Sequence, residues 1–386
     1  MSTEPQLATR TEPDLGAYLS DCRELALGEI RRMVPRDDPH ANVLYDLMLD
    51  YPMRGAKGLR PTLCIAACRA LGGGIEAVLP SAALVELYHN AFLIHDDIED
   101  GSEQRRDRPT LHRMHGVPIA INVGDGMLAL ALAPLLENTR VVGLGPALRI
   151  MQTVSRMARE TAEGQAIELD WIRRDEWRLD DDDYRRMVVK KTGWYSFMAP
   201  VAIGAIVAGA SAGQIEALTD MARELSIAFQ IQDDILNLKS SAIRYGKEVN
   251  GDLWEGKRTL ILLHALRTIS PDERTIAIGI LSLSRPTHRV DLESTLAELQ
   301  LAGEISTTTR DRILAALGCG AYKTAHDIDA LRRWIADTDS IAYAERICRY
   351  HAEQSRAALA RVDGLSSSAH SDVLHALIDF TIEREH

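Results

Sequence analysis

The chain has 386 residues, of which 46% are hydrophobic and 26% are charged, and Ala and Leu supply most of the apolar side chains. This balance is typical of a helix-rich globular protein. The net charge of -12 argues against sequence-independent nucleic-acid binding, which requires a dense basic surface, but not against a phosphorylated small molecule held by a few local cations.

Residues 1–14 are predicted to form a flexible polar tail, because they lack the apolar run that a signal peptide requires. The cysteines are odd in number and lack the paired spacing of a zinc site or a disulfide framework. They are Cys22, Cys64, Cys68, Cys319 and Cys348. Both observations favour a protein that stays in the reducing cytoplasm.

From residue 15 onward, apolar side chains recur with helical spacing, for example along 84–92. No stretch alternates convincingly as a strand. Breaks fall at Gly72–Gly74 and Gly143–Pro146, and Ser270–Pro271 is expected to begin a helix. We therefore predict an all-α protein of roughly ten or more helices in one domain, residues 15–386.

Two segments are less typical of a compact bundle. The longest apolar stretch, Phe197 to Ala212, is shorter than the roughly 20 residues of a membrane span, so it is interpreted as a buried central helix. No integral membrane segment is expected. Residues from about 282 to 329 are more polar and less regular, and are interpreted as an insertion without an assigned role.

Three carboxylates gather at the end of the apolar helix predicted to run through residue 94. In the run HDDIED, Asp96, Asp97 and Asp100 lie near one helix face. Such a cluster requires a counter-ion, and Mg²⁺ prefers carboxylate oxygens together with water and substrate phosphates. The alternative for this motif alone is a solvated acidic helix end.

A second acidic pair weakens that alternative. In FQIQDDILN, Asp233 and Asp234 again end an apolar helical run, and Gln230 precedes them on the same face. Two such helix ends facing each other across a bundle could hold two or three Mg²⁺ ions. The acidic run Asp180–Asp183, by contrast, is interpreted as a helix N-cap and first turn.

Local groups of cations accompany the two acidic motifs, and Arg and Lys are the usual protein ligands of phosphate oxygens. They are Lys57 with Arg60, Arg105 with Arg106, Lys190 with Lys191, Lys247, and Lys257 with Arg258. Each group alone would be interpreted as a solvated surface pair. Their order around the two acidic motifs predicts a diphosphate-binding site.

From GAKGLRP through HDDIEDGSEQRRDRPT, EGQAIELD, KKTG and FQIQDDILN to YGKEVNGDLWEGKRT, the sequence resembles the trans-isoprenyl diphosphate synthases of the polyprenyl synthetase family, of the geranylgeranyl diphosphate synthase type. The resemblance implies a large helical bundle around a central cavity and a homodimer. It also implies Mg²⁺-dependent head-to-tail condensation of isopentenyl diphosphate with an allylic diphosphate.

The resemblance also assigns roles to individual residues. The predicted ligands of isopentenyl diphosphate are Lys57, Arg60, His89 and Arg106. The predicted ligands of the allylic diphosphate are Arg105, Lys191, Thr192, Gln230, Lys247 and Lys257. The predicted catalytic residues are Asp96, Asp97, Asp100, Lys191, Gln230, Asp233 and Asp234, of which Asp96, Asp100 and Asp233 ligate Mg²⁺. Two positions depart from the family pattern: Asn237 ends the second motif, and Asp107 replaces the usual Gly of the RRGxPT loop.

Three residues below Asp96 on the same helix are predicted to limit product length: Tyr88, Ala91 and Phe92. Phe92 lies one turn below Asp96, and a helical turn spans about 5.4 Å, so the aromatic rings would stop growth after a few isoprene units. We predict a short to medium all-trans product, with C20 favoured over C15 or C25.

Two other functions use the same motifs. A class I terpene cyclase ionises a prenyl diphosphate without a second substrate, but Lys57, Arg60 and His89 favour condensation. A non-catalytic partner subunit of a synthase would be expected to lose an aspartate motif, and this chain retains both.

Overall fold

The computed structural model describes residues 14–35, 38–239, 250–284, 289–316, 322–365 and 367–383. It confirms the all-α fold, since the described residues form helices and a single two-stranded ribbon. Lys247 and Cys319 lie outside this part of the chain.

The first half of the chain, up to residue 173, contains the following elements. They are α1 (Leu15–Met33), η1 (Pro39–Ala41), α2 (Asn42–Met53), α3 (Leu59–Ala70), α4 (Ile75–Glu99), β1 (Gln104–Arg105), β2 (Arg108–Pro109), α5 (Leu111–His115), α6 (Val117–Leu130), α7 (Leu132–Val141) and α8 (Leu144–Arg173).

The second half continues with α9 (Asp181–Val188), the π-helix η2 (Val189–Met198), α10 (Ala199–Val207), α11 (Ala212–Lys239), α13 (Gly251–Glu255), α14 (Leu260–Thr268), α15 (Pro271–Leu281), α16 (Arg289–Leu301), α17 (Thr307–Ala316), α18 (Ala325–Asp337), α19 (Ser340–Leu359) and α20 (Ala369–Glu383).

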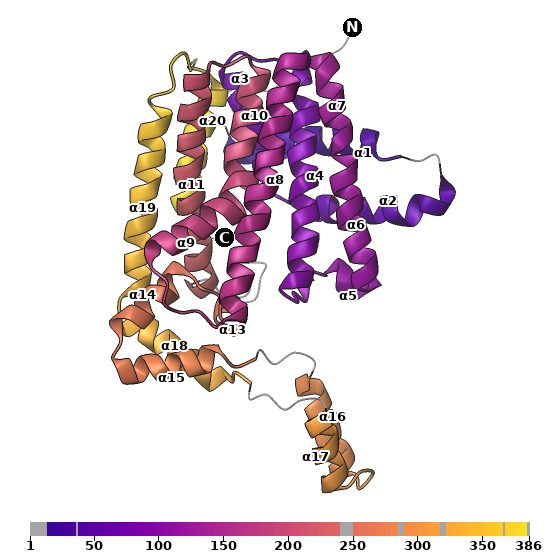
Figure 1. Ribbon diagram of the computed structural model, residues 1–386, viewed down its shortest axis with the longest axis vertical. Helices are drawn as coiled ribbons and strands as arrows, with labels where there is room; N and C mark the ends of the chain where they lie inside the picture. The colour runs from indigo at the N-terminus through magenta and orange to yellow at the C-terminus, as the bar shows by residue number, and fades with distance from the viewer. Residues whose placement is uncertain are drawn as a thin grey trace.

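Long helices run side by side through the body of the molecule, with α4, α8, α10 and α11 in the middle and α19 along α11 (Figure 1). α3 and α10 approach closely because Gly204 faces the Cys64 carbonyl, where an added Cβ would lie 2.1 Å from the oxygen. Cys64 and Cys68 are fully buried there and pack as small hydrophobic residues of the core.

Two helix starts follow their sequence signals. Ser270 caps α15 through a capping box with Glu273, and Pro271 occupies the first turn. Asp180 and Asp183 form the capping box of α9, which confirms that this acidic run is a helix N-terminus.

The predicted breaks at Gly72–Gly74 and Gly143–Pro146 are confirmed, because they separate α3 from α4 and begin α8. The predicted helix through Ala212 is wrong at its C-terminal end. α10 ends at Val207, since Gly209 adopts a positive φ of 76° that terminates it, and α11 begins at Ala212.

The segment predicted as an insertion contains α16 and α17, which lie against each other and project beyond α15 and α18 in Figure 1. Leu301, the last residue of α16, is 88% exposed. Its interpretation as an insertion stays a prediction.

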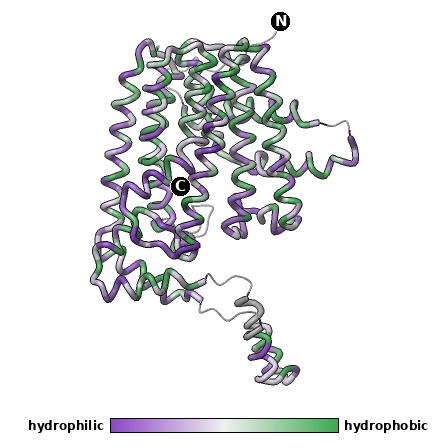
Figure 2. The backbone as a smooth tube through the Cα atoms, in the orientation of Figure 1, coloured by the Kyte–Doolittle hydropathy of each residue, from purple (hydrophilic) through white to green (hydrophobic). Residues whose placement is uncertain are grey.

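Two segments among the described residues are long and apolar enough to be considered as membrane spans, Ile75–Glu99 and Val117–Val141. The first is α4, which is mostly buried inside the bundle. The second is α6 with α7, whose hydrophobic residues are visible in Figure 2 and are less covered. A buried core helix passes the same criterion, so these segments are weak evidence for a membrane span.

Candidate functional site

The first aspartate motif lies at the C-terminal end of α4. Asp97 is fully buried, and both of its carboxylate oxygens accept hydrogen bonds from the protein. The Tyr51 hydroxyl donates to Oδ2 at 2.6 Å, and Arg105 Nε donates to Oδ1 at 3.0 Å with Nη2 adding a shorter contact. Asp97 is thus held inside the protein by α2 and β1.

Asp96 is directed differently and faces α8 and η2. Lys191 Nζ lies 3.1 Å from its Oδ1 and also pairs with the buried Glu168 of α8, while Arg105 lies 4.0 Å from Oδ2. Burial opposes ionisation of Asp96, but Lys191 and Arg105 outweigh it and hold the pKa of this carboxyl below its usual value. Asp96 is therefore ionised at neutral pH.

Asp100 is the C-cap of α4, where the helix dipole already disfavours negative charge. Although part of the residue reaches solvent, the surrounding protein limits hydration of its carboxylate, and the neighbouring Asp96 adds repulsion. Together they raise the pKa of Asp100 to about 8.

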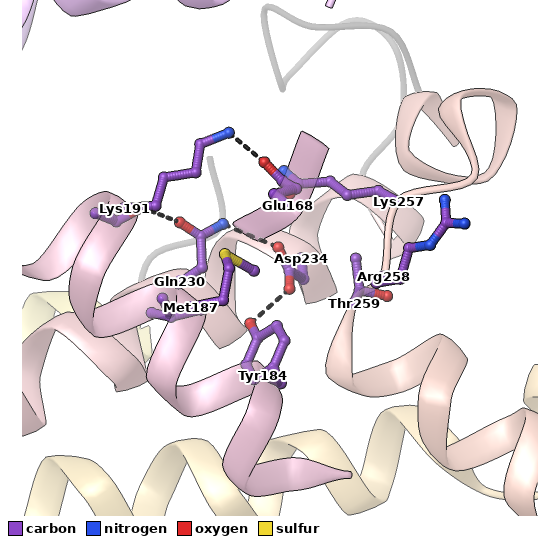
Figure 3. Close-up of a pocket in the computed structure, with 11 residues that line it drawn as sticks. Glu168, Tyr184, Met187, Lys191, Gln230, Asp234, Lys257, Arg258 and Thr259 are labelled. Atoms are coloured by element: carbon purple, nitrogen blue, oxygen red, sulfur yellow. Dashed lines mark hydrogen bonds and ion pairs between the residues drawn. The ribbon is translucent and has the colours of Figure 1, made fainter. Parts of the chain in front are cut away.

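The second aspartate motif lies on α11 and repeats this arrangement. Asp234 is buried, and its two oxygens accept hydrogen bonds from the Tyr184 hydroxyl at 2.7 Å and from Gln230 Nε2 at 3.0 Å (Figure 3). Burial raises the pKa of Asp234 to about 7 despite the nearby Lys257. Asp233, one residue earlier, is only partly buried.

Two lysines complete this region of the protein. Lys191 lies in the π-helix, and α8 comes close to it because Gly164 has no side chain: an added Cβ would lie 2.2 Å from the Lys191 nitrogen. Lys257 extends toward Glu168 in Figure 3. A pocket borders both lysines and Thr192, whose hydroxyl donates to Gln230 Oε1 at 3.2 Å.

We call this region the acidic site. It consists of Asp96, Asp97, Asp100, Glu168, Lys191, Thr192, Gln230, Asp233, Asp234 and Lys257. Arg258, although adjacent in sequence, packs its guanidinium over the Trp177 ring at 3.9 Å and donates to backbone carbonyls, so its role is structural.

The β1–β2 ribbon was not expected from the sequence, because it is only two residues long on each side. Its turn residues, Arg106 and Asp107, both have positive φ values, 53° and 58°. A two-residue turn of this kind prefers Gly, Asn or Asp, so Asp107 can adopt the turn conformation at a position where the family usually has Gly. The turn directs Arg105 to Asp97 and Arg106 to the Tyr51 carbonyl, at 2.9 Å.

A second group of residues, which we call the cationic site, consists of Arg60, His89 and Arg106. Arg60 Nη2 donates to Ser196 Oγ at 2.8 Å, and His89 stacks on Tyr195 with ring centres 5.8 Å apart. Burial and the nearby arginines hold the pKa of His89 well below its usual value, so this imidazole is neutral at pH 7.

The cationic site carries unsatisfied hydrogen-bonding atoms. His89 Nδ1 and Arg60 Nε are buried and have no hydrogen-bond partner among the residues that the structure describes. Burial and the repulsion of Arg60 and Arg105 lower the pKa of Arg106 to about 10, partly offset by Glu86. Buried donors without partners and crowded positive charges both favour an anion here.

Lys57 contacts a different part of the protein from the other predicted ligands of isopentenyl diphosphate. Its ammonium lies over the Phe380 ring of α20, 5.3 Å from the ring centre.

Below Asp96 on α4, Phe92 packs between Tyr88 and Tyr195, at 5.8 and 5.5 Å between ring centres, and Ala91 is fully buried. These three aromatic rings form an apolar layer under the acidic site.

Mg²⁺ fits this set of donors only in part. Among the described residues, no three His, Cys, Asp or Glu side chains come together closely enough to hold a metal by themselves. Mg²⁺ commonly binds through one or two carboxylates and completes its shell with water and substrate phosphates. Asp96, Asp100 and Asp233 are suitable for this mode, because Asp96 and Asp233 are partly exposed and Asp100 is exposed at the end of α4.

Sequence reasoning missed four residues of these sites: Tyr51, Tyr184, Tyr195 and Glu168. The two tyrosines that hold aspartates are 46 and 50 positions away from their partners, so no local pattern joins them. Glu168 had a weak signal, because EGQAIELD was part of the family resemblance and an acid there could pair with Lys191.

Comparisons with known proteins agree with this geometry. The polyprenyl synthetase family model matches residues 42–299. A short chain isoprenyl diphosphate synthase of Methanocaldococcus jannaschii is 36% identical over 253 residues, which is 66% of this chain and 74% of the relative. A geranylfarnesyl diphosphate synthase of Aeropyrum pernix is 31% identical over 335 residues, or 86% of this chain and 91% of the relative.

The fold comparison gives the same family. The crystal structure of geranylgeranyl pyrophosphate synthetase from Pyrococcus horikoshii matches with a TM-score of 0.78 at 28% identity, covering 96% of this chain and 99% of that chain. The chain therefore belongs to the polyprenyl synthetase family, and it is a prenyltransferase that acts as a trans-prenyl diphosphate synthase.

Proposed function

We propose that the protein catalyses Mg²⁺-dependent head-to-tail condensation of isopentenyl diphosphate with an allylic diphosphate. The observation that carries the proposal is that α4 brings two unlike phosphate sites together. Asp96 faces the acidic site, and His89, seven residues earlier, belongs to the cationic site. Two diphosphates can therefore bind near one helix.

In the acidic site, Lys191 and Lys257 bind the allylic diphosphate together with the adjacent Arg105, and Thr192 and Gln230 orient it. Mg²⁺, when bound by Asp96, Asp100 and Asp233, supplies positive charge to the diphosphate as it leaves. The lysines stabilise the same developing charge, so the carbon–oxygen bond ionises to an allylic cation. The partly buried aromatic layer shields that cation from water.

In the cationic site, Arg60, Arg106 and His89 hold the diphosphate of isopentenyl diphosphate, with Lys57 as a further cation. The double bond of this substrate attacks the allylic cation, and one proton then leaves the new chain. Because His89 is neutral, it donates to an anion through one ring nitrogen without adding charge to the crowded arginines. The released diphosphate is a suitable base for the proton.

The two-substrate requirement is the decisive test. Purified protein supplied with Mg²⁺ and both substrates should release diphosphate, whereas either substrate alone should give none. Release from the allylic diphosphate alone, with a cyclised product, would indicate a terpene cyclase. No release under any condition would indicate a partner subunit without activity of its own.

We further propose a C20 product. Relatives bear names that imply different lengths, geranylfarnesyl among them, so the support is the position of Phe92, one turn below Asp96 and braced by Tyr88 and Tyr195. Products from labelled isopentenyl diphosphate should be mainly C20, and dominant C30 or longer products would contradict this. Phe92→Ala should lengthen the product, and an unchanged profile would remove Phe92 as the limit.

A homodimer is proposed on the family resemblance and on an exposed apolar face. This face consists of Leu132, Leu136, Val141, Leu144, Leu148 and Met151, each at least 40% exposed. Large exposed apolar side chains gathered on the neighbouring helices α7 and α8 are typical of an interface. Leu144→Asp should lower the mass in analytical ultracentrifugation, while Leu301→Asp on the projecting α16 should not. An unchanged mass would place the interface elsewhere.

A reducing compartment is proposed as the site of action. The four described cysteines are free thiols and buried, namely Cys22, Cys64, Cys68 and Cys348. This is consistent with work in the cytoplasm. Fractionation that recovered the protein outside the cytoplasm would overturn it.

A further inference from the structure

Both aspartate motifs share an arrangement that the proposed chemistry does not explain. In each, the second aspartate points into the protein and is buried, whereas the first is only partly buried. In each, a buried tyrosine from another helix donates its hydroxyl hydrogen to that second aspartate.

At the first motif the tyrosine is Tyr51 of α2. Its hydroxyl donates to Asp97 at 2.6 Å and accepts a hydrogen bond from the Leu111 backbone nitrogen at 3.3 Å, so it links three elements. Tyr51 itself is fully buried, and its ring is covered by the Arg54 guanidinium, 4.5 Å from the ring centre. The ring therefore has little freedom to move.

At the second motif the tyrosine is Tyr184 of α9. Its hydroxyl donates to Asp234 at 2.7 Å, and the residue is 1% exposed (Figure 3). The capping box of Asp180 and Asp183 fixes the start of this short helix, with Tyr184 at the end of its first turn. Here, too, the hydroxyl belongs to a side chain that is almost completely buried.

A helix that is fixed at one residue is fixed in rotation about its axis. Adjacent residues of an α-helix point about 100° apart, so holding Asp97 inward determines where Asp96 faces. The same holds for Asp234 and Asp233. The effect is largest for α4, which ends at Glu99, because helix ends fray unless side chains hold them.

We propose that Tyr51 and Tyr184 are positioning residues that orient the first aspartate of each motif for Mg²⁺. Neither hydroxyl is needed to touch a substrate or the metal. Both oxygens of Asp97 and of Asp234 already accept hydrogen bonds from protein donors, which suits anchors better than ligands. The proposal rests on the Mg²⁺ requirement proposed above.

The test is metal affinity in variants that lose only the hydroxyl. Mn²⁺ is titrated into Tyr51→Phe, Tyr184→Phe and wild-type protein in the presence of inorganic diphosphate, and free Mn²⁺ is followed by electron paramagnetic resonance. Loss of a residue that orients a metal ligand typically weakens binding 10- to 100-fold, so we expect about tenfold weaker Mn²⁺ binding in each variant.

Tyr18→Phe is the matched control. Tyr18 is also buried, and its hydroxyl hydrogen-bonds with His370 Nδ1 at 2.9 Å, far from both aspartate motifs in sequence. Its Mn²⁺ affinity should equal that of the wild type. Thermal denaturation of all four proteins shows that each is folded at the temperature of the titration.

The outcomes separate the possibilities. Unchanged Mn²⁺ affinity in both tyrosine variants would overturn the proposal, and a loss in one alone would overturn it for the other. An equal loss in Tyr18→Phe would show that the effect is general destabilisation, which also overturns it. Wild-type protein that binds no Mn²⁺ with diphosphate would instead overturn the Mg²⁺ requirement, and the positioning role would fall with it.

Discussion

The acidic site and the cationic site both include residues of α4, but they differ in the charge that each offers to a proposed diphosphate ligand. In the acidic site, carboxylates outnumber cations, and Lys191 is already paired with Asp96 and Glu168. In the cationic site, Arg60 and His89 keep buried hydrogen-bonding atoms without partners. The acidic site therefore requires added positive charge before it can accept an anion, whereas the cationic site can accept an anion without it.

This difference assigns the chemistry. A diphosphate that is held by fixed arginines stays bound as a substrate handle, while one that is neutralised by added cations can depart with its charge stabilised. We therefore propose that the leaving group is bound in the acidic site.

Asp233→Ala should have the largest effect. Removal of one carboxylate from the acidic site should lower kcat on the order of 10³-fold, because metal-assisted charge stabilisation contributes several kcal/mol to the transition state. Steady-state turnover with both substrates measures it. Asp220→Ala, on the same helix but paired with Arg223 at the surface, should change turnover less than about twofold. Similar losses in both variants would show that the effect is not specific to the motif.

Chelation of divalent metal should affect the two sites unequally. With EDTA, a non-hydrolysable allylic diphosphate analogue should bind about 100-fold more weakly, because the carboxylates then repel it. Binding of isopentenyl diphosphate should change less than about threefold, since arginines hold it. Calorimetric titration of each ligand with and without Mg²⁺ gives both numbers. Equal losses for the two ligands would end the distinction between the sites.

Arg60→Ala tests the cationic site from the other side. A hydrogen bond to a charged group contributes about 1.5–3 kcal/mol, so KM for isopentenyl diphosphate should rise about 10- to 100-fold. KM for the allylic substrate should be almost unchanged. Arg60→Lys keeps the charge but not the planar fork, and should recover part of the affinity. A rise in the allylic KM instead would reverse our assignment of the two substrates.

The smallest effect concerns pH. The unfolded chain protonates His89 near pH 6.5, whereas burial and the arginines hold its folded pKa well below that value, so stability is lost as pH falls below 6.5. His89→Gln removes this contribution. Between pH 6.5 and 5.5, the free energy of unfolding of the variant should therefore fall by about 1 kcal/mol less than that of the wild type. Urea unfolding at pH 8, 6.5 and 5.5 measures it, with pH 8 as the reference. Parallel pH profiles would show that His89 is not buried in its neutral form.

Much of the molecule was predictable because its signals are local. Periodicity predicted the helices, and capping residues such as Ser270 and Asp180 predicted where two of them begin. The motif spacing predicted that Asp96 and Asp100 lie near one helix end. These features depend on residues within one or two turns of each other.

Long-range features were not predictable in the same way. Asp96 and Asp97 look equivalent in sequence, and only the packing of α2 shows that Asp97 turns inward to Tyr51. In the sequence, Arg258 resembles Lys257 as a phosphate ligand. Only the structure shows that its guanidinium packs over the Trp177 ring. Each depends on a partner dozens of positions away, about which local periodicity carries no information.

The two-residue turn between β1 and β2 has a consequence for the geometry of the reaction. Arg105 and Arg106 are neighbours in sequence, yet one contacts Asp97 of the acidic site and the other belongs to the cationic site. Under the proposed function, this short turn would fix the spacing between one cation of each diphosphate site, so a shift of the ribbon would displace Arg105 and Arg106 together.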